Sequence, residues 1–256
     1  KSSSTEKNFF SKVKPTIHWL SKTFDKKYLE TYDHFGITRF NALRNGILSL
    51  FRAKYRKSFI DKNSLMVLPH NQKFLYFPMQ VQPERNVDLD APFHSNQIEV
   101  ISQIAKSIPI DYKLYVKEHP NMKFRNWRKI SDYKKIKEIP NVELIHPSVR
   151  PDEIIKKCEL AITIAGNAGL EAAFYRKPSI VFASMIYSLL PSVFRVKNIQ
   201  DLAITINHAL KTEVKLSDLN NYSGIIENNS FHFDEISLNN KILDKFHPAG
   251  FVISDN

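Results

Sequence analysis

One polar segment of the chain combines a lysine, a histidine and a proline directly after an apolar run. The segment Tyr115–Val116 is followed by Lys117, Glu118, His119 and Pro120. The imidazole N–H of His119 can donate to a phosphate oxygen, and Lys117 can add positive charge. Because proline fixes its backbone φ angle, Pro120 holds the turn that aims the imidazole. We predict that these four residues bind a phosphate, although a histidine of this kind can also serve only in packing.

A second segment joins an apolar run to a helical one through small residues. Gly166, Asn167, Ala168 and Gly169 form the junction, and Glu171 follows in the first helical turn. Glycines allow close approach to a phosphate, which the free N–H groups of a helix start can bind. We expect these four residues to hold phosphate and Glu171 to reach a ribose. The spacing matches neither the dinucleotide fingerprint nor the ATPase loop, and a tight turn that binds nothing is the alternative.

A third polar segment, Pro78 to Arg85, carries two amides, a carboxylate and a guanidinium. Gln80, Gln82 and Arg85 can bind sugar hydroxyls, so we assign them to sugar or acceptor contacts. Glu84 is the candidate catalytic base, and His119 is the other candidate catalytic residue. A solvated loop punctuated by prolines is the competing interpretation.

The elements that must position these segments alternate in the manner of a parallel sheet with crossover helices. We predict five parallel strands, Phe74–Val81, Lys113–Lys117, Val142–Ile145, Leu160–Ala165 and Ser179–Ala183. Helices are predicted over about Ser95–Ser107, Asn126–Glu138, Pro151–Lys157, Ala168–Tyr175 and Gln200–Leu210. In open parallel sheets ligands bind beyond the carboxyl ends of the strands, so the three polar segments should meet at one edge.

The positive charge is concentrated near the start of the chain. Residues 1–62 hold 14 of the 37 Lys and Arg residues but only 5 of the 26 Asp and Glu residues. Within them, Phe40, Leu43, Ile47, Leu50, Phe51 and Tyr55 recur at helical spacing. We predict a helix that packs on the body or on an absent domain. Attraction to an anionic membrane is the alternative, whereas nucleic acid is not expected because the body is nearly neutral.

Other features exclude whole classes of protein. No stretch approaches the roughly 18 apolar residues of a membrane span, and the single cysteine, Cys158, cannot form an internal disulfide. We therefore expect a reducing, cytoplasmic environment, no metal cluster, and a buried, unreactive Cys158. His146-Pro147 and the charge run Lys134–Lys137 are interpreted as a loop and a solvated helix face. The chain starts at Lys1 without methionine, which suggests a trimmed or partial polypeptide.

Taken together, the segments resemble a known family. The residues are Phe77-Pro78-Met79-Gln80 with Gln82-Pro83-Glu84, then Leu114 to Pro120, then Gly166 to Ala172 with Lys177-Pro178. They look like the C-terminal, nucleotide-binding half of GT-B glycosyltransferases, particularly the bacterial capsule polysaccharide biosynthesis group that includes the Kdo transferases. The resemblance covers less than half of the chain. It implies that the His-Pro block contacts the phosphate of a CMP-activated sugar and that the small-residue block holds phosphate and ribose.

The resemblance has two further consequences. GT-B enzymes use a second Rossmann-like domain for the acceptor, and residues 1–62 are too short to form it, so this side should be absent or reduced. The non-hydrolysing UDP-sugar 2-epimerases are also similar, through the turn His119-Pro120-Asn121. Their later acidic pair is matched only in part, because Glu171 is followed by Ala172.

These observations lead to one set of expectations. The fold is α/β, with a basic helical N-terminal segment (1–62), a Rossmann-like nucleotide-sugar-binding domain (63–212) and a C-terminal tail (213–256). The function is transfer of a sugar from a CMP- or UDP-linked donor to a glycan or glycolipid acceptor of bacterial surface polysaccharide. No cofactor is expected, and the place of action is the cytoplasm or the inner face of the membrane. The alternatives are a UDP-sugar 2-epimerase-like enzyme and a catalytically silent nucleotide-sugar-binding or membrane-docking module.

Overall fold

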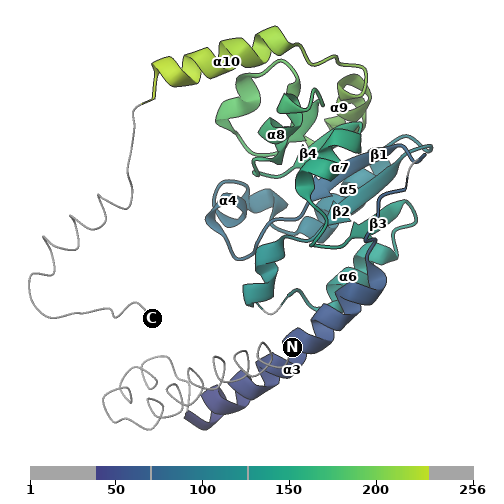
Figure 1. Ribbon diagram of the computed structural model, residues 1–256, viewed down its shortest axis with the longest axis vertical. Helices are drawn as coiled ribbons and strands as arrows, with labels where there is room; N and C mark the ends of the chain where they lie inside the picture. Colours follow the sequence, from purple (N-terminus) through teal and green to yellow (C-terminus); the bar gives the residue numbers. More distant parts are fainter. Residues whose placement is uncertain (1–38, 70, 126, 231–256) are drawn as a thin grey trace, which may run out of the picture.

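A six-stranded parallel sheet forms the centre of the computed structural model, which describes residues 39–69, 71–125 and 127–230 (Figure 1). The strand order is β3-β2-β1-β4-β5-β6, and every neighbouring pair is parallel. The strands are β1 (Phe74–Pro78), β2 (Lys113–Lys117), β3 (Val142–Ile145), β4 (Leu160–Thr163), β5 (Ser179–Val181) and β6 (Val193–Arg195). This arrangement confirms the predicted Rossmann-like parallel sheet.

The number and length of the strands differ from the prediction. Five strands were expected, and the sixth, β6, was missed because three residues with only Val193 buried show no periodic pattern. The first strand ends at Pro78 rather than Val81, which places Gln80 in the turn that follows. Strands β4 and β5 also end two residues early, because their ladders with neighbouring strands stop at Thr163 and Val181.

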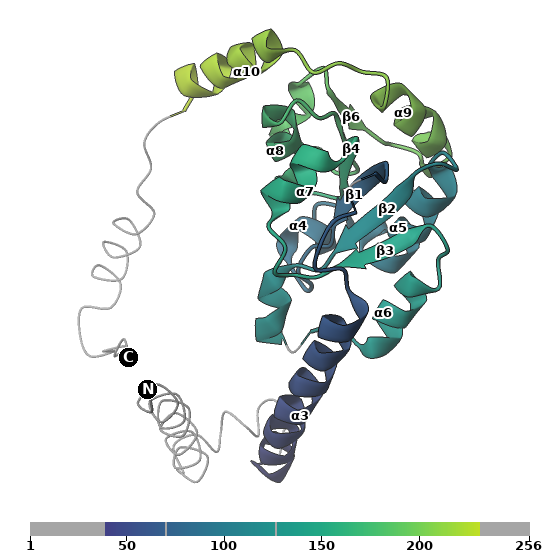
Figure 2. The ribbon, with the colours of Figure 1, turned by 45° about the vertical axis from the view of Figure 1, so that its right-hand side comes forward.

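Helices cover both faces of the sheet. The α-helices of the described residues are α3 (Arg39–Asn63), α4 (Arg85–Asp88), α5 (Gln97–Ser107), α6 (Ile130–Lys137), α7 (Pro151–Lys157), α8 (Ala168–Phe174), α9 (Leu202–Ala209) and α10 (Leu216–Asn228). Short 3-10 turns are η2 (Pro92–His94), η3 (Pro120–Arg125), η4 (Ile186–Leu189) and η5 (Ile199–Asp201). Figure 2 shows α7 and α8 on one side of the sheet and α6 and α9 on the other.

Alternate side chains of β1 pack into two core clusters, one on each face of the sheet. Leu75 and Phe77 pack in the cluster formed with α5, α6 and α9, whereas Phe74 and Tyr76 pack in the cluster formed with α7 and α8. Successive residues of a strand point to opposite faces, so a strand buried on both sides is apolar throughout. That is why the short strands were readable in the sequence.

Two helices differ from the prediction for identifiable reasons. Helix α6 begins at Ile130, because residues 120–125 form η3 and Trp127 has a φ of 60°, outside the helical region. Residue 126, where the prediction began this helix, is outside the described residues. Helix α10 was not predicted within the C-terminal tail, since Leu219 is its only buried residue and the apolar periodicity is weak. The tail beyond residue 230 lies outside the described residues.

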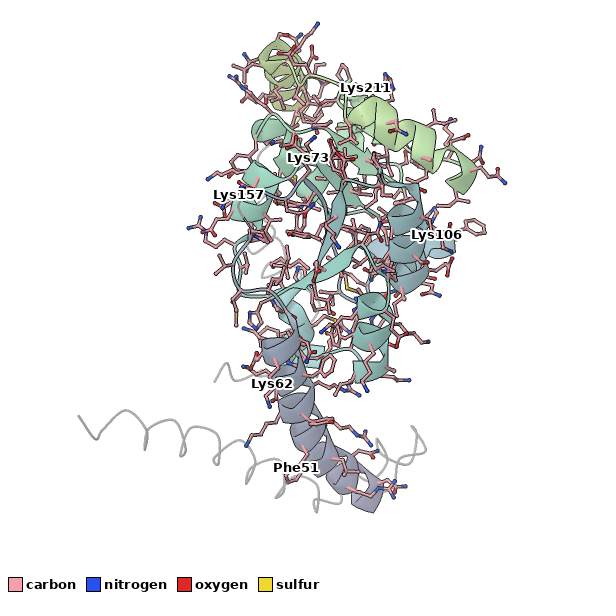
Figure 3. The ribbon with its side chains drawn as sticks, turned by 90° about the vertical axis from the view of Figure 1, so that its right-hand side faces the viewer. Phe51, Lys62, Lys73, Lys106, Lys157 and Lys211 are labelled. Carbon is pink, nitrogen blue, oxygen red and sulfur yellow. The ribbon has the colours of Figure 1, made fainter. Side chains whose placement is uncertain are left out.

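Helix α3 extends away from the sheet, and its last two turns contact the body (Figure 1). Ile60 is buried, and Asp61 Oδ1 lies 3.1 Å from His146 Nε2. Farther up the helix, Phe51 and Tyr55 are 70% and 71% exposed. Figure 3 shows Phe51 well away from the body. The last turns therefore pack as predicted, whereas Phe51 and Tyr55 do not. The side chains of Phe40, Leu43, Ile47 and Leu50, and residues 1–38, lie outside the described residues.

No helix in the described ranges is both long and apolar enough to cross a bilayer.

Candidate functional site

A cavity of about 390 Å³ opens at the carboxyl ends of β1, β2 and β4. The chain runs from β1 to β2 and β3 on one side, and β4 to β6 follow on the other side of β1. This reversal of strand order is where open α/β sheets bind their ligands. The predicted residues that line the cavity are Gln80, Glu84, Lys117, Glu118, His119, Pro120, Gly166, Asn167, Ala168 and Glu171. The structure thus brings together the three polar segments that lie far apart in the sequence.

Lys117 is an unusual component of this cavity. It is the last residue of β2 and only 3% exposed, yet its ammonium has no hydrogen-bond or ion-pair partner among residues 39–69, 71–125 and 127–230. Burial lowers the pKa of Lys117 to about 8, against the opposing attraction of Glu118. A buried cation without a partner favours the binding of an anion.

His119 is held in one tautomer by its own turn. The backbone N–H of Asn121 donates to His119 Nδ1 at 3.1 Å. Nδ1 is therefore the accepting ring nitrogen, which leaves Nε2 as the nitrogen that can carry a donating N–H. His119 can thus donate a hydrogen bond through Nε2, as the prediction of a phosphate contact requires. Pro120 begins η3 and fixes the start of this turn.

Glu118 uses its carboxylate inside the protein. It is 2% exposed, and its Oε1 accepts the backbone N–H of His119 at 2.8 Å. Its Oε2 accepts from Arg128 Nε at 2.8 Å and from the hydroxyl of Tyr133 at 2.9 Å. These contacts stabilise the turn that carries His119, and they leave Glu118 little capacity for the donor contact that was expected of it.

The side-chain amides of Gln80 and Gln82, which were predicted to bind a sugar, form hydrogen bonds within the protein. The donors around Gln80 orient its amide so that the oxygen accepts the N–H of Gly166 at 2.6 Å and of Ala165 at 3.0 Å. Gln82 donates to the carbonyl of Ser95 at 2.7 Å and accepts from Gln97 Nε2 at 2.8 Å. Gln82 is not among the residues that line the cavity, and these hydrogen bonds hold its amide within the protein.

Neighbouring side chains leave no room for a Cβ atom at Gly166 and Gly169 in the small-residue turn. A Cβ on Gly166 would come within 2.8 Å of both the Gln80 amide and Thr163 Oγ1. A Cβ on Gly169 would come within 2.8 Å of the ring of Tyr187, whose hydroxyl donates to the carbonyl of Gly166. Gly169 is buried against Tyr187 and is not among the residues that line the cavity. Asn167 and Ala168 do line the cavity.

The remaining candidates lie at the mouth of the cavity. Glu84 and Glu171 line it with exposed side chains, where a carboxylate can meet a ligand. Arg85 is the first residue of α4, and its side chain is not among those that the structure describes. Among the described residues, no group of His, Cys, Asp and Glu side chains is arranged to hold a metal ion.

The surroundings of His146, Cys158 and the run Lys134–Lys137 agree with the structural roles predicted for them. Ser148 N–H donates to His146 Nδ1 at 3.2 Å, as Asn121 does to His119, but His146 Nε2 faces Asp61 of α3 rather than the cavity. Cys158 is fully buried, and burial raises its pKa to about 12. The lysines of the run Lys134–Lys137 are exposed on α6.

Sequence reasoning missed Gln97 and Arg128, which hold the turn after β1. Gln97 is 2% exposed, and its amide bonds both the N–H and the carbonyl of Gln80, at 2.8 and 3.0 Å. Arg128 Nη1 donates to Gln82 Oε1 at 3.1 Å. A glutamine among the apolar residues at the start of a predicted helix was the only sequence signal for either residue.

A family model described as capsule polysaccharide biosynthesis protein matches residues 3–192. The chain belongs to this family. The match spans strands β1 to β5 and therefore every segment that lines the cavity. The family resemblance noted from the sequence is confirmed by this match.

Solved structures are similar to parts of this chain at low sequence identity. The beta Kdo 2,7 transferase of KpsC from Thermosulfurimonas dismutans is 16% identical, with a TM-score of 0.41, over 60% of this chain and 52% of that one. The UDP-GlcNAc 2-epimerase from Methanocaldococcus jannaschii is 19% identical, with a TM-score of 0.44, over 70% and 55%. The chain thus spans about half the length of these proteins. No curated protein sequence matches the chain.

Proposed function

We propose that this member of the capsule family is a glycosyltransferase, or the donor-binding part of one, that uses a nucleotide-activated sugar. The observation that carries the proposal is the buried ammonium of Lys117, which has no partner among the residues that the structure describes, in a cavity at the reversal of strand order. His119 adds an N–H donor to the same cavity. A cation and an N–H donor at the carboxyl edge of a Rossmann-like sheet suit the phosphate of a nucleotide.

The chemistry that we propose is displacement of the nucleotide at the anomeric carbon. An acceptor hydroxyl forms a bond to that carbon, the bond to the phosphate oxygen breaks, and the electron pair stays on the departing phosphate. Lys117 and His119 would stabilise the negative charge that develops there. Glu84, exposed at the mouth, would accept the proton of the acceptor hydroxyl. With these residues in place of a divalent cation, the reaction needs no metal.

The donor nucleotide, the acceptor and the residues that contact them are proposed from the resemblance of the sequence to the capsule family. We propose a CMP- or UDP-linked donor and an acceptor that is part of a bacterial surface polysaccharide. Asn167, Ala168 and Glu171 would lie against the phosphate and ribose. An epimerase is the competing function, and it differs because it interconverts a UDP-sugar without an acceptor.

We also propose that α3 attaches the protein to an anionic membrane at its cytoplasmic face. Arg52 and Lys54 are exposed beside the exposed rings of Phe51 and Tyr55, and the exposed Lys57 pairs with Asp61 at 2.6 Å. Basic side chains near an anionic surface contribute about 1 kcal/mol each, and aromatic rings add apolar contact at the interface. Flotation with phosphatidylglycerol vesicles should weaken from low to high salt. Equal recovery with neutral vesicles would refute this attachment.

The test of the donor site is nucleotide binding by the whole chain. CMP, CDP, UDP and GDP are each added at millimolar concentration, and thermal unfolding is followed. A nucleotide at about 100 times its dissociation constant adds roughly 2.7 kcal/mol of stability. One nucleotide should stabilise the wild type, and His119→Ala should lose the effect. The control is His208→Ala, because His208 is exposed on α9 and does not line the cavity.

Two outcomes separate the alternatives. Slow hydrolysis of the bound donor without acceptor supports a transferase, whereas binding without any turnover points to a silent module. If no nucleotide stabilises the wild type, the proposed donor site is wrong.

A further inference from the structure

Arg128 connects two of the turns that line the cavity without lining it itself. Its Nε donates to Glu118 in the turn after β2, and its Nη1 donates to Gln82 in the turn after β1. Its Nη2 donates to the backbone carbonyl of Gln80. The Arg128 side chain is 11% exposed and is absent from the lining of the cavity. One planar guanidinium therefore bridges three acceptors that come from two different strand ends.

Two of the acceptors of Arg128, Glu118 and Gln80, form hydrogen bonds with residues of the turns that line the cavity. The other oxygen of Glu118 accepts the backbone N–H of His119, and Gln80 lies against the turn at Gly166. The guanidinium of Arg128 thus joins the turn that carries Glu84 to the turn that carries His119. Both turns end strands that are direct neighbours in the sheet, but the strands themselves end at Pro78 and Lys117. Beyond those residues, the ladder leaves the turns unconnected except for the bond from Met79 N–H to the Lys117 carbonyl.

The residue directly before Arg128, Trp127, has an uncommon backbone conformation. Trp127 has a φ of 60°, a conformation that is uncommon for any residue other than glycine. Its N–H donates to the carbonyl of Met122 at 2.8 Å, and its carbonyl accepts from Arg56 of α3 at 3.0 Å. A backbone conformation of this kind persists only where surrounding contacts determine it, and such sites are often functional.

We propose that Arg128 is the positioning residue of the donor site: it fixes the turn after β1 against the turn after β2, so that Glu84 and His119 face one ligand. This inference rests on the proposed function for its ligand, but the contacts of Arg128 stand independently of it. Arg128 acts through Glu118, Gln80 and Gln82 and does not touch the ligand.

The decisive variant is Arg128→Lys. Lysine keeps the positive charge beside the buried Glu118, but its single ammonium cannot bond three separated acceptors in a plane. The fold should therefore survive while the connection is lost. A matched control is Arg125→Ala, because Arg125 is exposed on η3, three residues away, and has no interaction with another described residue. A second variant, Glu118→Gln with Arg128→Met, removes both charges and so leaves no unpaired buried carboxylate.

Two measurements are made on each variant at a temperature where it is folded. Hydrogen exchange should become faster at the His119 amide and in residues 80–84, with no change in β1, β4 or β5. The affinity for the nucleotide that stabilises the wild type should fall about tenfold or more, as expected when a binding group is misplaced. Arg125→Ala should change neither quantity.

The outcomes separate this inference from the proposed function. Faster local exchange with weaker nucleotide binding in both the Arg128→Lys and the double variant supports the positioning role. Unchanged exchange at His119 overturns it, and so does faster exchange with unchanged affinity. If the wild type binds no nucleotide, the proposed function fails, and faster exchange at both turns alone then supports Arg128 as their connection.

Discussion

Replacing Lys117 with methionine should stabilise the protein and abolish nucleotide binding. Lys117 is 3% exposed, and its pKa is lowered from 10.5 to about 8. A shift of that size corresponds to about 3 kcal/mol against the charged ammonium in the folded state. Methionine has a similar length and no charge, so it avoids this cost below pH 8. For a chain of this size, about 3 kcal/mol would raise the melting temperature by about 6 to 12 °C as an upper bound.

The effect should depend on pH in a direction set by the pKa. Because the folded pKa of Lys117 is below the unfolded one, the unfolded chain binds more protons between about pH 8 and pH 10.5. The stability that the wild type lacks at neutral pH is therefore regained as the pH rises through this window. The advantage of Lys117→Met should be full below pH 8 and should vanish by about pH 10.5.

The assay is urea unfolding at pH 7 and pH 10, with nucleotide binding measured on the same samples. Lys135→Met is the control, because Lys135 is exposed on α6 and its replacement should leave stability nearly unchanged. The reasoning is refuted if Lys117→Met is less stable than the wild type at pH 7, since the ammonium would then have a compensating partner. Retained nucleotide affinity in the variant would instead remove Lys117 from the donor site.

Three further predictions test other parts of the site. Glu84→Gln should leave nucleotide affinity unchanged but lower donor turnover at least about 100-fold, and unchanged turnover would exclude Glu84 as the base. Gly169→Ala should destabilise the protein by about 1–3 kcal/mol in urea unfolding, because the added Cβ meets the Tyr187 ring at 2.8 Å. Cys158 should resist a maleimide at pH 8 in the folded protein and react after unfolding, since its thiol is buried with a pKa near 12; rapid labelling of the folded protein would contradict this burial.

The sequence alone was sufficient for the scaffold and for the meeting of the polar segments at one cavity. Strands buried on both faces are apolar throughout, so five of the six were visible as short runs such as Leu160–Thr163. Parallel strands place their carboxyl ends at one edge, so the polar segments that follow them had to meet. Where the local pattern was short or weak, as in β6 and α10, the prediction missed the element.

The tertiary structure decided which of the polar residues are available to a ligand. Gln80 and Gln82 were readable as amides at a strand end, but their partners Gln97 and Arg128 lie 15 to 48 residues away in the chain. Lys117 has no such partner in the described ranges, which nothing in its local sequence indicates. The reason is physical: a chain's local pattern determines which backbone segments form, whereas hydrogen bonds between buried side chains depend on which segments pack together.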